Sequence, residues 1–247
     1  MSLTLQTAND YYRELSYTLD PNEIIKWTIN RFGIEHITVG TGFGAPGIVL
    51  IDLLIKINPK IDIFYIDPGF LFEETYKLKI QLEKYFNTEI TRYSTSLSIK
   101  GQSEKYGEKL WESNPNLCCN LRKVQPLHLA LEKKDVWITG IRKAQTKFRV
   151  NSEIIEYDER FNVTKVNPLI NWTHEQVWKY IHENNLPYNE LHDKGYPSLG
   201  CINCTSTVSE NEDDRSGRWR GNLKTECGLH YIESTNEIKP IQHGNTK

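Results

Sequence analysis

The five cysteines are the residues of this sequence with the clearest capacity for chemistry. Four of them form an adjacent pair and a C-x-x-C half-site, Cys118-Cys119 and Cys201-x-x-Cys204. A C-x-x-C half-site brings two thiolates to one metal centre, and four thiolates suit either Zn²⁺ or an iron–sulfur cluster. Spacing does not choose between these metals, although the frequency of closed four-cysteine zinc sites favours zinc. Burial as ordinary core side chains is the alternative for each cysteine.

The fifth cysteine, Cys227, stands apart near the end of the chain and is followed by glycine. Lys224 and His230 are close to it in sequence and could lower the pKa of its thiol, which would create a nucleophilic thiolate. Arg215 and Arg218 lie upstream, three residues apart, and a pair of arginines at this spacing can grip a sulfate-like or phosphate-like group. The alternatives are a surface thiol without a role and two solvated charges.

Three turns follow predicted strands and are candidate ligand loops. The first is a glycine-rich turn, Thr41-Gly42-Phe43-Gly44, which precedes a helix, so that backbone N–H groups could hold a phosphate there. It matches neither the Walker A pattern nor GxGxxG. The other two are Asp67-Pro68-Gly69 and Gly140-Ile141-Arg142. Because ligands of open α/β sheets bind beyond the carboxyl ends of the strands, the three turns together favour an anionic, nucleotide-like ligand. Each alone is an ordinary connection.

The elements that must position these residues alternate between β and α. Apolar periodicity, capping residues and turn signals predict them. Helices are expected at 21–32, 46–57, 73–86, 121–134 and 173–184, and strands at 34–39, 61–66, 89–93, 136–139, 154–157 and 161–166. This order predicts an α/β fold with a mostly parallel sheet wrapped by helices. We expect a nucleotide-binding domain over 1–200 and a mobile C-terminal segment over 201–247, because the last residues are loop-like and rich in Gly, Asp, Asn and Ser.

Composition limits the classes of protein that remain. The chain has 247 residues, 38% of them hydrophobic and 25% charged, which is typical of a globular protein. The net charge of -2 argues against broad nucleic-acid binding. No apolar run is long enough to span a membrane, and the first residues lack the pattern of a secretory signal. An odd cysteine count without such a signal argues against a disulfide framework, and we expect a cytoplasmic protein.

Eight segments resemble the assimilatory adenylyl-sulfate and phosphoadenylyl-sulfate reductases. They are Thr-Gly-Phe-Gly-Ala (41–45), Tyr-Ile-Asp-Pro-Gly (65–69), Cys-Cys-Asn-Leu-Arg-Lys-Val-Gln-Pro-Leu (118–127), Thr-Gly-Ile-Arg-Lys (139–143), Val-Asn-Pro-Leu-Ile-Asn-Trp (166–172), Tyr-Pro-Ser-Leu-Gly-Cys-Ile-Asn-Cys-Thr (196–205), Arg-Ser-Gly-Arg-Trp (215–219) and Glu-Cys-Gly-Leu-His (226–230). The last three and the segment with the vicinal cysteines are specific, and chance agreement of all four in this order is implausible.

This resemblance implies an adenine-nucleotide α-hydrolase-like fold with a modified pyrophosphatase loop. It also reverses the preference for zinc, because the family branch that has all four additional cysteines uses them to hold a [4Fe–4S] cluster. That branch characteristically uses adenylyl sulfate, and some members also accept the 3′-phosphorylated form. This chain departs from the family pattern at Pro46, Gly47, Pro68 and Ala144, all of which fall on the expected nucleotide crevice.

The resemblance leads to a mechanism in which the Cys227 thiolate attacks the sulfonate sulfur, AMP leaves, and a cysteine S-sulfonate remains. Arg215, Arg218 and Lys123 are expected to hold the sulfonate, and Arg142 the α-phosphate or ribose side. His230 would orient or polarise the thiol segment. The turns at 41–44 and 67–69, including Asp67 and Gly69, would seat adenosine and phosphate.

The other four cysteines are assigned to the cluster, so an external thioredoxin-like dithiol is expected to release sulfite. Three alternatives stay open at this point. They are the same chemistry on phosphoadenylyl sulfate, an ATP-pyrophosphatase-like sulfur-transfer enzyme, and a zinc-binding interaction module. Oligomeric state is also left open, with a homo-oligomer as one outcome.

Overall fold

The computed structural model describes residues 20–222, 224 and 226–230. Its centre is a six-stranded sheet in the order β3-β2-β1-β4-β6-β5. The strands are β1 (Ile37–Thr41), β2 (Asp62–Asp67), β3 (Thr91–Ser94), β4 (Val136–Ile138), β5 (Ile155–Asp158) and β6 (Val163–Val166). Every neighbouring pair is parallel except β5 with β6. The predicted α/β fold with a mostly parallel sheet is therefore confirmed.

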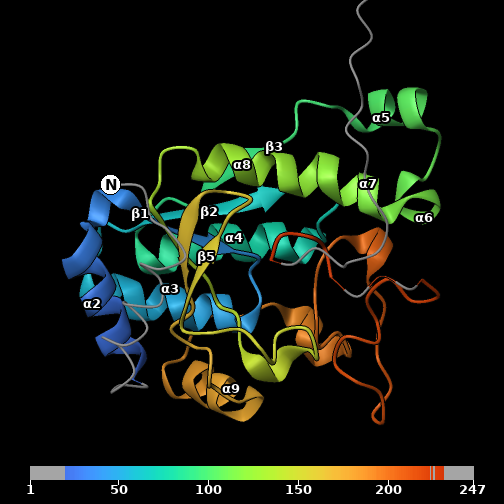
Figure 1. Ribbon diagram of the computed structural model, residues 1–247. Helices are drawn as coiled ribbons and strands as arrows, with labels where there is room; N and C mark the ends of the chain where they lie inside the picture. The colour runs from blue at the N-terminus through green and yellow to red at the C-terminus, as the bar shows by residue number, and fades with distance from the viewer. Residues whose placement is uncertain (1–19, 223, 225, 231–247) are drawn as a thin grey trace, which may run out of the picture.

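Helices cover both faces of this sheet, and Figure 1 shows α8 on one side and α3 on the other. The α-helices are α2 (Pro21–Phe32), α3 (Ala45–Ile57), α4 (Glu73–Phe86), α5 (Ile99–Tyr106), α6 (Leu110–Ser113), α7 (Pro115–Cys119), α8 (Gln125–Leu131) and α9 (His174–Glu183). A π-helical turn, Asn120–Val124, joins α7 to α8. Short 3₁₀ turns occupy Ile34–His36, Lys143–Gln145, Glu190–Lys194 and Ile202–Cys204.

The ends of the helices follow from local side-chain chemistry. Asp20 caps α2 by accepting a hydrogen bond from the backbone N–H of Asn22 at 2.9 Å, and Gly33 ends this helix with a φ of 81°. Thr173 and Gln176 form a reciprocal capping box at the start of α9. The helix expected at 121–134 differs most from expectation, because it is the π-helical turn followed by the shorter α8, and α7 precedes them.

The core has two parts, one on each face of the sheet. The larger part centres on α3, most of whose apolar side chains are buried between the sheet, α2 and α9. The smaller part lies under α8, where Leu127 and Leu131 pack with Phe64 and Trp137 from the strands. This burial supplies the main driving force for holding the strands in register.

The strand order predicts a crevice at the carboxyl ends of the central strands, between β1 and β4. The chain runs from β1 outward to β2 and β3, and then crosses to β4 on the other side of β1. This reversal of direction beside β1 is the point at which open α/β sheets bind ligands beyond the carboxyl ends of the strands.

The C-terminal part of the chain contacts this sheet domain. An isolated bridge joins Leu71 to Cys201, and the backbone N–H of Ile202 donates to the carbonyl oxygen of Phe70 at 2.8 Å. A second bridge, between Thr205 and Arg218, lies within the C-terminal part itself. The division at residue 200 stays a prediction. Among the described residues, no helix is long and apolar enough to cross a membrane.

Candidate active site

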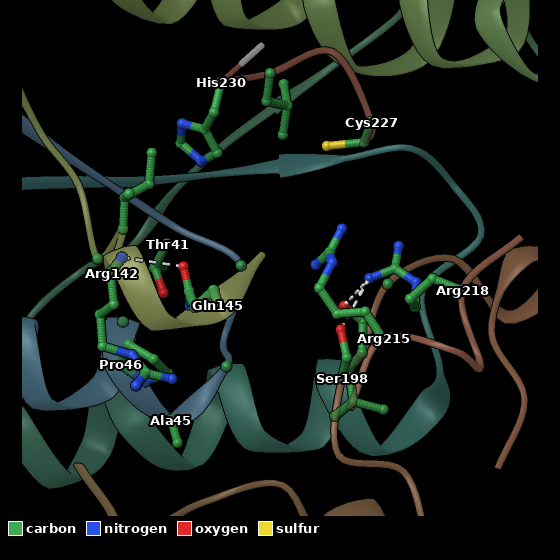
Figure 2. Close-up of a pocket in the computed structure, with 18 of the residues that line it drawn as sticks. Thr41, Ala45, Pro46, Arg142, Gln145, Ser198, Arg215, Arg218, Cys227 and His230 are labelled. Carbon is green, nitrogen blue, oxygen red and sulfur yellow. Dashed lines mark hydrogen bonds between the residues drawn. The ribbon is translucent and has the colours of Figure 1, made fainter. Parts of the chain in front are cut away.

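A cavity of about 310 Å³ lies at the carboxyl ends of β1, β2 and β4. Its volume is at the lower end of the usual range for small-molecule sites. Nine of the residues expected to bind substrate or act in catalysis line it: Thr41, Gly42, Gly44, Lys123, Arg142, Arg215, Arg218, Cys227 and His230. They come from the last residue of β1 and the turn after it, the π-helical turn, the loop after β4, and the segments 215–218 and 227–230. Figure 2 shows Cys227, Arg215 and Arg218 on one side of this space, and Thr41 and Arg142 on the other.

Three expected ligand residues do not line the cavity. Phe43 is 2% exposed and packs against Tyr65 with ring centroids 5.1 Å apart, so its side chain belongs to the core. Asp67 is buried and accepts hydrogen bonds from the backbone N–H of Gly69 at 2.8 Å and from Arg92 Nε at 2.7 Å. Gly69 has a φ of 74°, a backbone conformation that glycine adopts without strain. These residues shape the turns, while Pro68 reaches the cavity.

The surroundings of Cys227 favour its thiolate. Burial by itself would raise the pKa of this thiol. The positive charges of Lys123 and Arg218 and a hydrogen bond from the backbone at Leu229 oppose that effect, and together they bring the pKa below its ordinary value. A half-buried thiol with a lowered pKa beside cations is the usual environment of a nucleophilic cysteine.

Neighbouring groups of the protein hold the cations of the cavity in place. Arg218 donates from Nη1 to the carbonyl oxygen of Leu199 at 2.8 Å, and its guanidinium lies 4.6 Å from the ring centroid of Trp219. Lys123 is only 8% exposed. Burial acts to lower the pKa of its ammonium, but the neighbouring sulfurs of Cys201, Cys119 and Cys227 together raise it by a larger amount. The net pKa is above its ordinary value, so Lys123 keeps its charge.

Glu226, which precedes the nucleophile, is anchored by two arginines. Its carboxylate is 2% exposed and accepts hydrogen bonds from Arg149 Nη2 at 2.9 Å, Arg149 Nε at 3.1 Å and Arg215 Nη2 at 3.2 Å. Arg149 is itself buried and also donates to Gln145. Sequence analysis missed this cluster, because Glu226 and Arg149 are 77 residues apart and no local pattern connects them.

The segment after Cys227 is also fixed. Arg160 donates to the carbonyl oxygens of Gly228 at 2.8 Å and Leu229 at 3.1 Å. The ring of His230 stacks on Trp137, with centroids 4.9 Å apart and an interplanar angle of 14°. Burial and four surrounding cations lower the pKa of His230 well below its ordinary value, so this imidazole is neutral at neutral pH.

The helix α9 and the turn Glu190–Lys194 supply another part of the lining that sequence analysis missed. His174, Trp178 and His192 line the cavity there, and the rings of Trp178 and His192 lie 5.2 Å apart. Flat aromatic and imidazole surfaces are suited to contact a planar base. Asp214 lies beside them and is 3.3 Å from His174 Nδ1.

The four remaining cysteines line a second, smaller cavity, which they share with Arg122 and Lys123. Each of them is a free thiol. Cys118 and Cys119 close α7, whereas Cys201 precedes the turn Ile202–Cys204 and Cys204 ends it. Burial raises the pKa of Cys118 to about 11 and that of Cys119 to about 12. Two thiol pairs from distant parts of the sequence therefore meet at one place.

A buried thiol with a raised pKa stays protonated until a metal displaces its proton, and the resulting thiolate is a good metal ligand. Arg122 and Lys123 would offset the charge of four thiolates. The donor set thus fits a cysteine-ligated cluster in its number, chemistry and counter-charges. Over the described part of the chain, no three His, Cys, Asp or Glu side chains are arranged to hold a single metal ion.

Comparisons with known proteins agree with this arrangement. The profile of the phosphoadenosine phosphosulfate reductase domain matches residues 36–207. The adenosine 5′-phosphosulfate reductase of Salinibacter ruber is 45% identical over 211 residues, which are 85% of this chain and 83% of the relative. The adenosine 5′-phosphosulfate reductase 2 of Bacillus subtilis is 42% identical over 232 residues, which are 93% and 98%.

Solved structures lead to the same family and confirm the predicted fold. A phosphoadenylyl-sulfate reductase from Candida auris, in complex with phosphate, has a TM-score of 0.72 at 32% identity, covering 84% of this chain and 99% of that one. An FMN adenylyltransferase from Candida glabrata has a TM-score of 0.57 at 16% identity, with coverages of 83% and 72%, and shares the fold alone. The sheet order, the lining of the cavity and these matches together assign the chain to the phosphoadenosine phosphosulfate reductase family.

Proposed function

We propose that this chain reduces adenylyl sulfate to sulfite and AMP, with electrons from a thioredoxin-like dithiol, through an S-sulfonate on Cys227. The observation that carries the proposal is the position of this thiol, in one cavity with Lys123, Arg215 and Arg218 and with a lowered pKa. Relatives named adenosine 5′-phosphosulfate reductase support the choice of substrate.

In the first half-reaction, the Cys227 thiolate attacks the sulfonate sulfur of adenylyl sulfate. A sulfur–sulfur bond forms, and the bond between this sulfur and the bridging phosphate oxygen breaks. AMP leaves with the electron pair of that bond. Because both reactants are anions, the barrier depends on cations fixed around the sulfonate, the role proposed for Lys123, Arg215 and Arg218.

In the second half-reaction, one thiolate of the external dithiol attacks the sulfur of Cys227. Sulfite leaves with the electron pair of the sulfur–sulfur bond, and a mixed disulfide forms. The second thiol of the donor resolves this disulfide and restores Cys227. The two thiols supply both electrons. An external donor is needed because the other four cysteines line a separate cavity.

The nucleotide would occupy the remainder of the main cavity. The backbone of the turn at 41–44 stands at the start of α3, where its N–H groups favour phosphate oxygens. Arg142 is proposed for the α-phosphate or ribose side, and its Nε is a buried donor without a hydrogen-bond partner among the described residues. His174, Trp178 and His192 offer surfaces for the base.

A [4Fe–4S] cluster is the proposed cofactor, with Cys118, Cys119, Cys201 and Cys204 as its ligands. When bound, it would supply negative charge and cross-link two distant segments beside Lys123. Lys123 would then be oriented toward the sulfonate by the π-helical turn that follows the first two ligands. Its ammonium would neutralise charge and carry no electrons.

We propose that the C-terminal segment predicted over 201–247 moves to bring Cys227 first to the nucleotide and then to the reductant. Residues 223, 225 and 231–247 of this segment lie outside the described part of the structure. A thioredoxin-like donor works in a reducing compartment, which supports a cytoplasmic location. A homo-oligomer stays an open prediction.

The same chemistry on phosphoadenylyl sulfate is the second candidate, and the similarity to the Candida auris enzyme favours it. Both are tested by incubating anaerobically purified protein and thioredoxin with each nucleotide, and measuring sulfite and kcat/KM. We expect sulfite and AMP from adenylyl sulfate, with the higher kcat/KM. A higher kcat/KM for the 3′-phosphorylated nucleotide would favour the second candidate, and no sulfite from either would refute both.

A further inference from the structure

The ion pair between Glu226 and Arg149 joins the nucleophile's segment to the body of the protein. Arg149 approaches the carboxylate with two parallel hydrogen bonds, from Nη2 to Oε2 at 2.9 Å and from Nε to Oε1 at 3.1 Å. Thr146 adds a hydrogen bond from Oγ1 to Oε1 at 3.2 Å. Thr146 and Arg149 belong to the loop between β4 and β5, so the contact bridges two distant parts of the chain.

The buried ion pair of Glu226 with Arg149 can hold the backbone beside Cys227 in one position. Both side chains are buried, at 2% exposed for Glu226 and 7% for Arg149. A bidentate arginine–carboxylate pair fixes direction as well as distance, and removing one partner from a buried pair leaves an uncompensated charge. Consecutive Cα atoms are about 3.8 Å apart, so fixing Glu226 also fixes the backbone of Cys227.

We infer that Glu226 is a positioning residue that latches Cys227 into the cavity through Arg149. The inference rests on the proposed function for its chemical meaning. The latch holds the thiolate toward the sulfonate during the first half-reaction. It opens for the second, because Cys227 is half-buried in the cavity and a dithiol protein needs a more exposed sulfur to attack.

The two half-reactions therefore place opposite demands on this contact. A weaker latch slows formation of the S-sulfonate, since Cys227 spends less time in position. The same change leaves attack by the dithiol unchanged or faster, since the open position becomes more populated. A general loss of structure would slow both steps, so the split distinguishes positioning from folding.

Two variants weaken the latch to different degrees. Glu226→Gln removes the charge that pairs with Arg149 and Arg215. Thr146→Val removes only the hydrogen bond from a neutral hydroxyl to this carboxylate and leaves every charge in place. Glu212→Gln is the matched control, because Glu212 pairs with Arg220 at 2.8 Å in the same part of the chain but on the surface.

The first measurement is the alkylation of Cys227 by iodoacetamide in the ligand-free protein, located by peptide mass spectrometry. Rates are compared on the plateau at high pH, where the thiol is ionised in every variant, because Glu226 also raises the pKa of Cys227 through its charge. We expect a rise of about tenfold for Glu226→Gln, the equivalent of one charge-assisted hydrogen bond, and a smaller rise for Thr146→Val. Glu212→Gln should match the wild type.

The second measurement is single-turnover kinetics of each half-reaction. Slower S-sulfonation with unchanged or faster release of sulfite supports the latch. Unchanged plateau alkylation in both variants, or equal slowing of both half-reactions, would overturn it. If the wild type forms no S-sulfonate, the proposed function fails, while the alkylation rates still decide whether Glu226 holds Cys227 in place.

Discussion

Gly200 lies against the guanidinium of Arg218, and this close approach makes Gly200→Ala a sharp test of the sulfonate site. A Cβ atom built at Gly200 would overlap Arg218 Nη2 and would lie 2.6 Å from Arg218 Cζ. Carbon atoms in contact ordinarily stay about 3.5 Å apart, so the guanidinium must move by roughly 1 Å. Gly200 has no positive φ that would itself disfavour alanine.

Arg218 cannot make this movement without losing contacts. Its Nη1 is 2.8 Å from the carbonyl oxygen of Leu199, and its guanidinium is stacked on Trp219. A displacement of about 1 Å from a catalytic geometry can reduce the rate by about 100-fold. We therefore expect Gly200→Ala to slow S-sulfonation by roughly 10- to 100-fold, with a much smaller effect on thermal stability, because the clash is with the end of one side chain.

The assay is the single-turnover rate of S-sulfonation at saturating adenylyl sulfate, with thermal unfolding measured in parallel. Gly101→Ala serves as the control, because a Cβ there would come no closer than 3.2 Å to a neighbour and Gly101 lies in α5, away from the cavity. A Gly200→Ala rate equal to that of the wild type, alongside a severely impaired Arg218→Ala, would refute the argument that Gly200 fixes the position of this guanidinium.

Two further predictions concern the charge and the metal around the nucleophile. Lys123 lowers the pKa of the Cys227 thiol, so Lys123→Ala should raise that pKa and move the rise of the pH–rate profile for S-sulfonation to higher pH. Lys179→Ala, which changes a 72% exposed side chain on α9, is the control and should leave the profile unchanged. Equal profiles for both variants would contradict the assignment. Cys204→Ser should lower the iron and acid-labile sulfide of anaerobically purified protein, both measured by colorimetric assay. Cys227→Ser is the control and should retain both. Full iron content in Cys204→Ser would contradict the proposed ligand set.

Local signals in the sequence were sufficient for most of the fold. Asp20, Pro21 and Gly33 predict α2 to the residue, because capping and glycine termination depend only on neighbouring residues. The helix α5 was missed, since its sequence IKGQSEKY has little apolar periodicity and its signal is confined to the Ser98 cap. The π-helical turn could not be separated from α-helix either, because its five residues do not reveal the hydrogen-bond spacing.

The candidate site was predictable where motifs carry it and hidden where it depends on contacts between distant residues. The types and spacing of Cys227, Arg215 and Arg218 indicated an anion site with a nucleophile, and the structure brings them to one cavity. Phe43 occurs in the expected phosphate turn, yet its side chain enters the core, a choice that turn sequences do not reveal.

The roles of three charged and aromatic residues could not have been inferred without the fold. Arg149, Arg160 and Trp137 contact the segment 226–230 across long stretches of chain. In sequence, the arginines resemble solvated charges, and Trp137 resembles an ordinary core residue of a strand. Only the strand order of the sheet brings them to the edge where Cys227 lies.

The most direct test of the account is the intact mass of the protein after mixing with adenylyl sulfate in the absence of reductant. We expect the mass to increase by one SO₃ group, to return to its starting value on addition of thioredoxin, and to stay unchanged throughout in Cys227→Ser. An SO₃ adduct on Cys227→Ser, or sulfite formed by that variant at the wild-type rate, would contradict the assignment of Cys227 as the nucleophile.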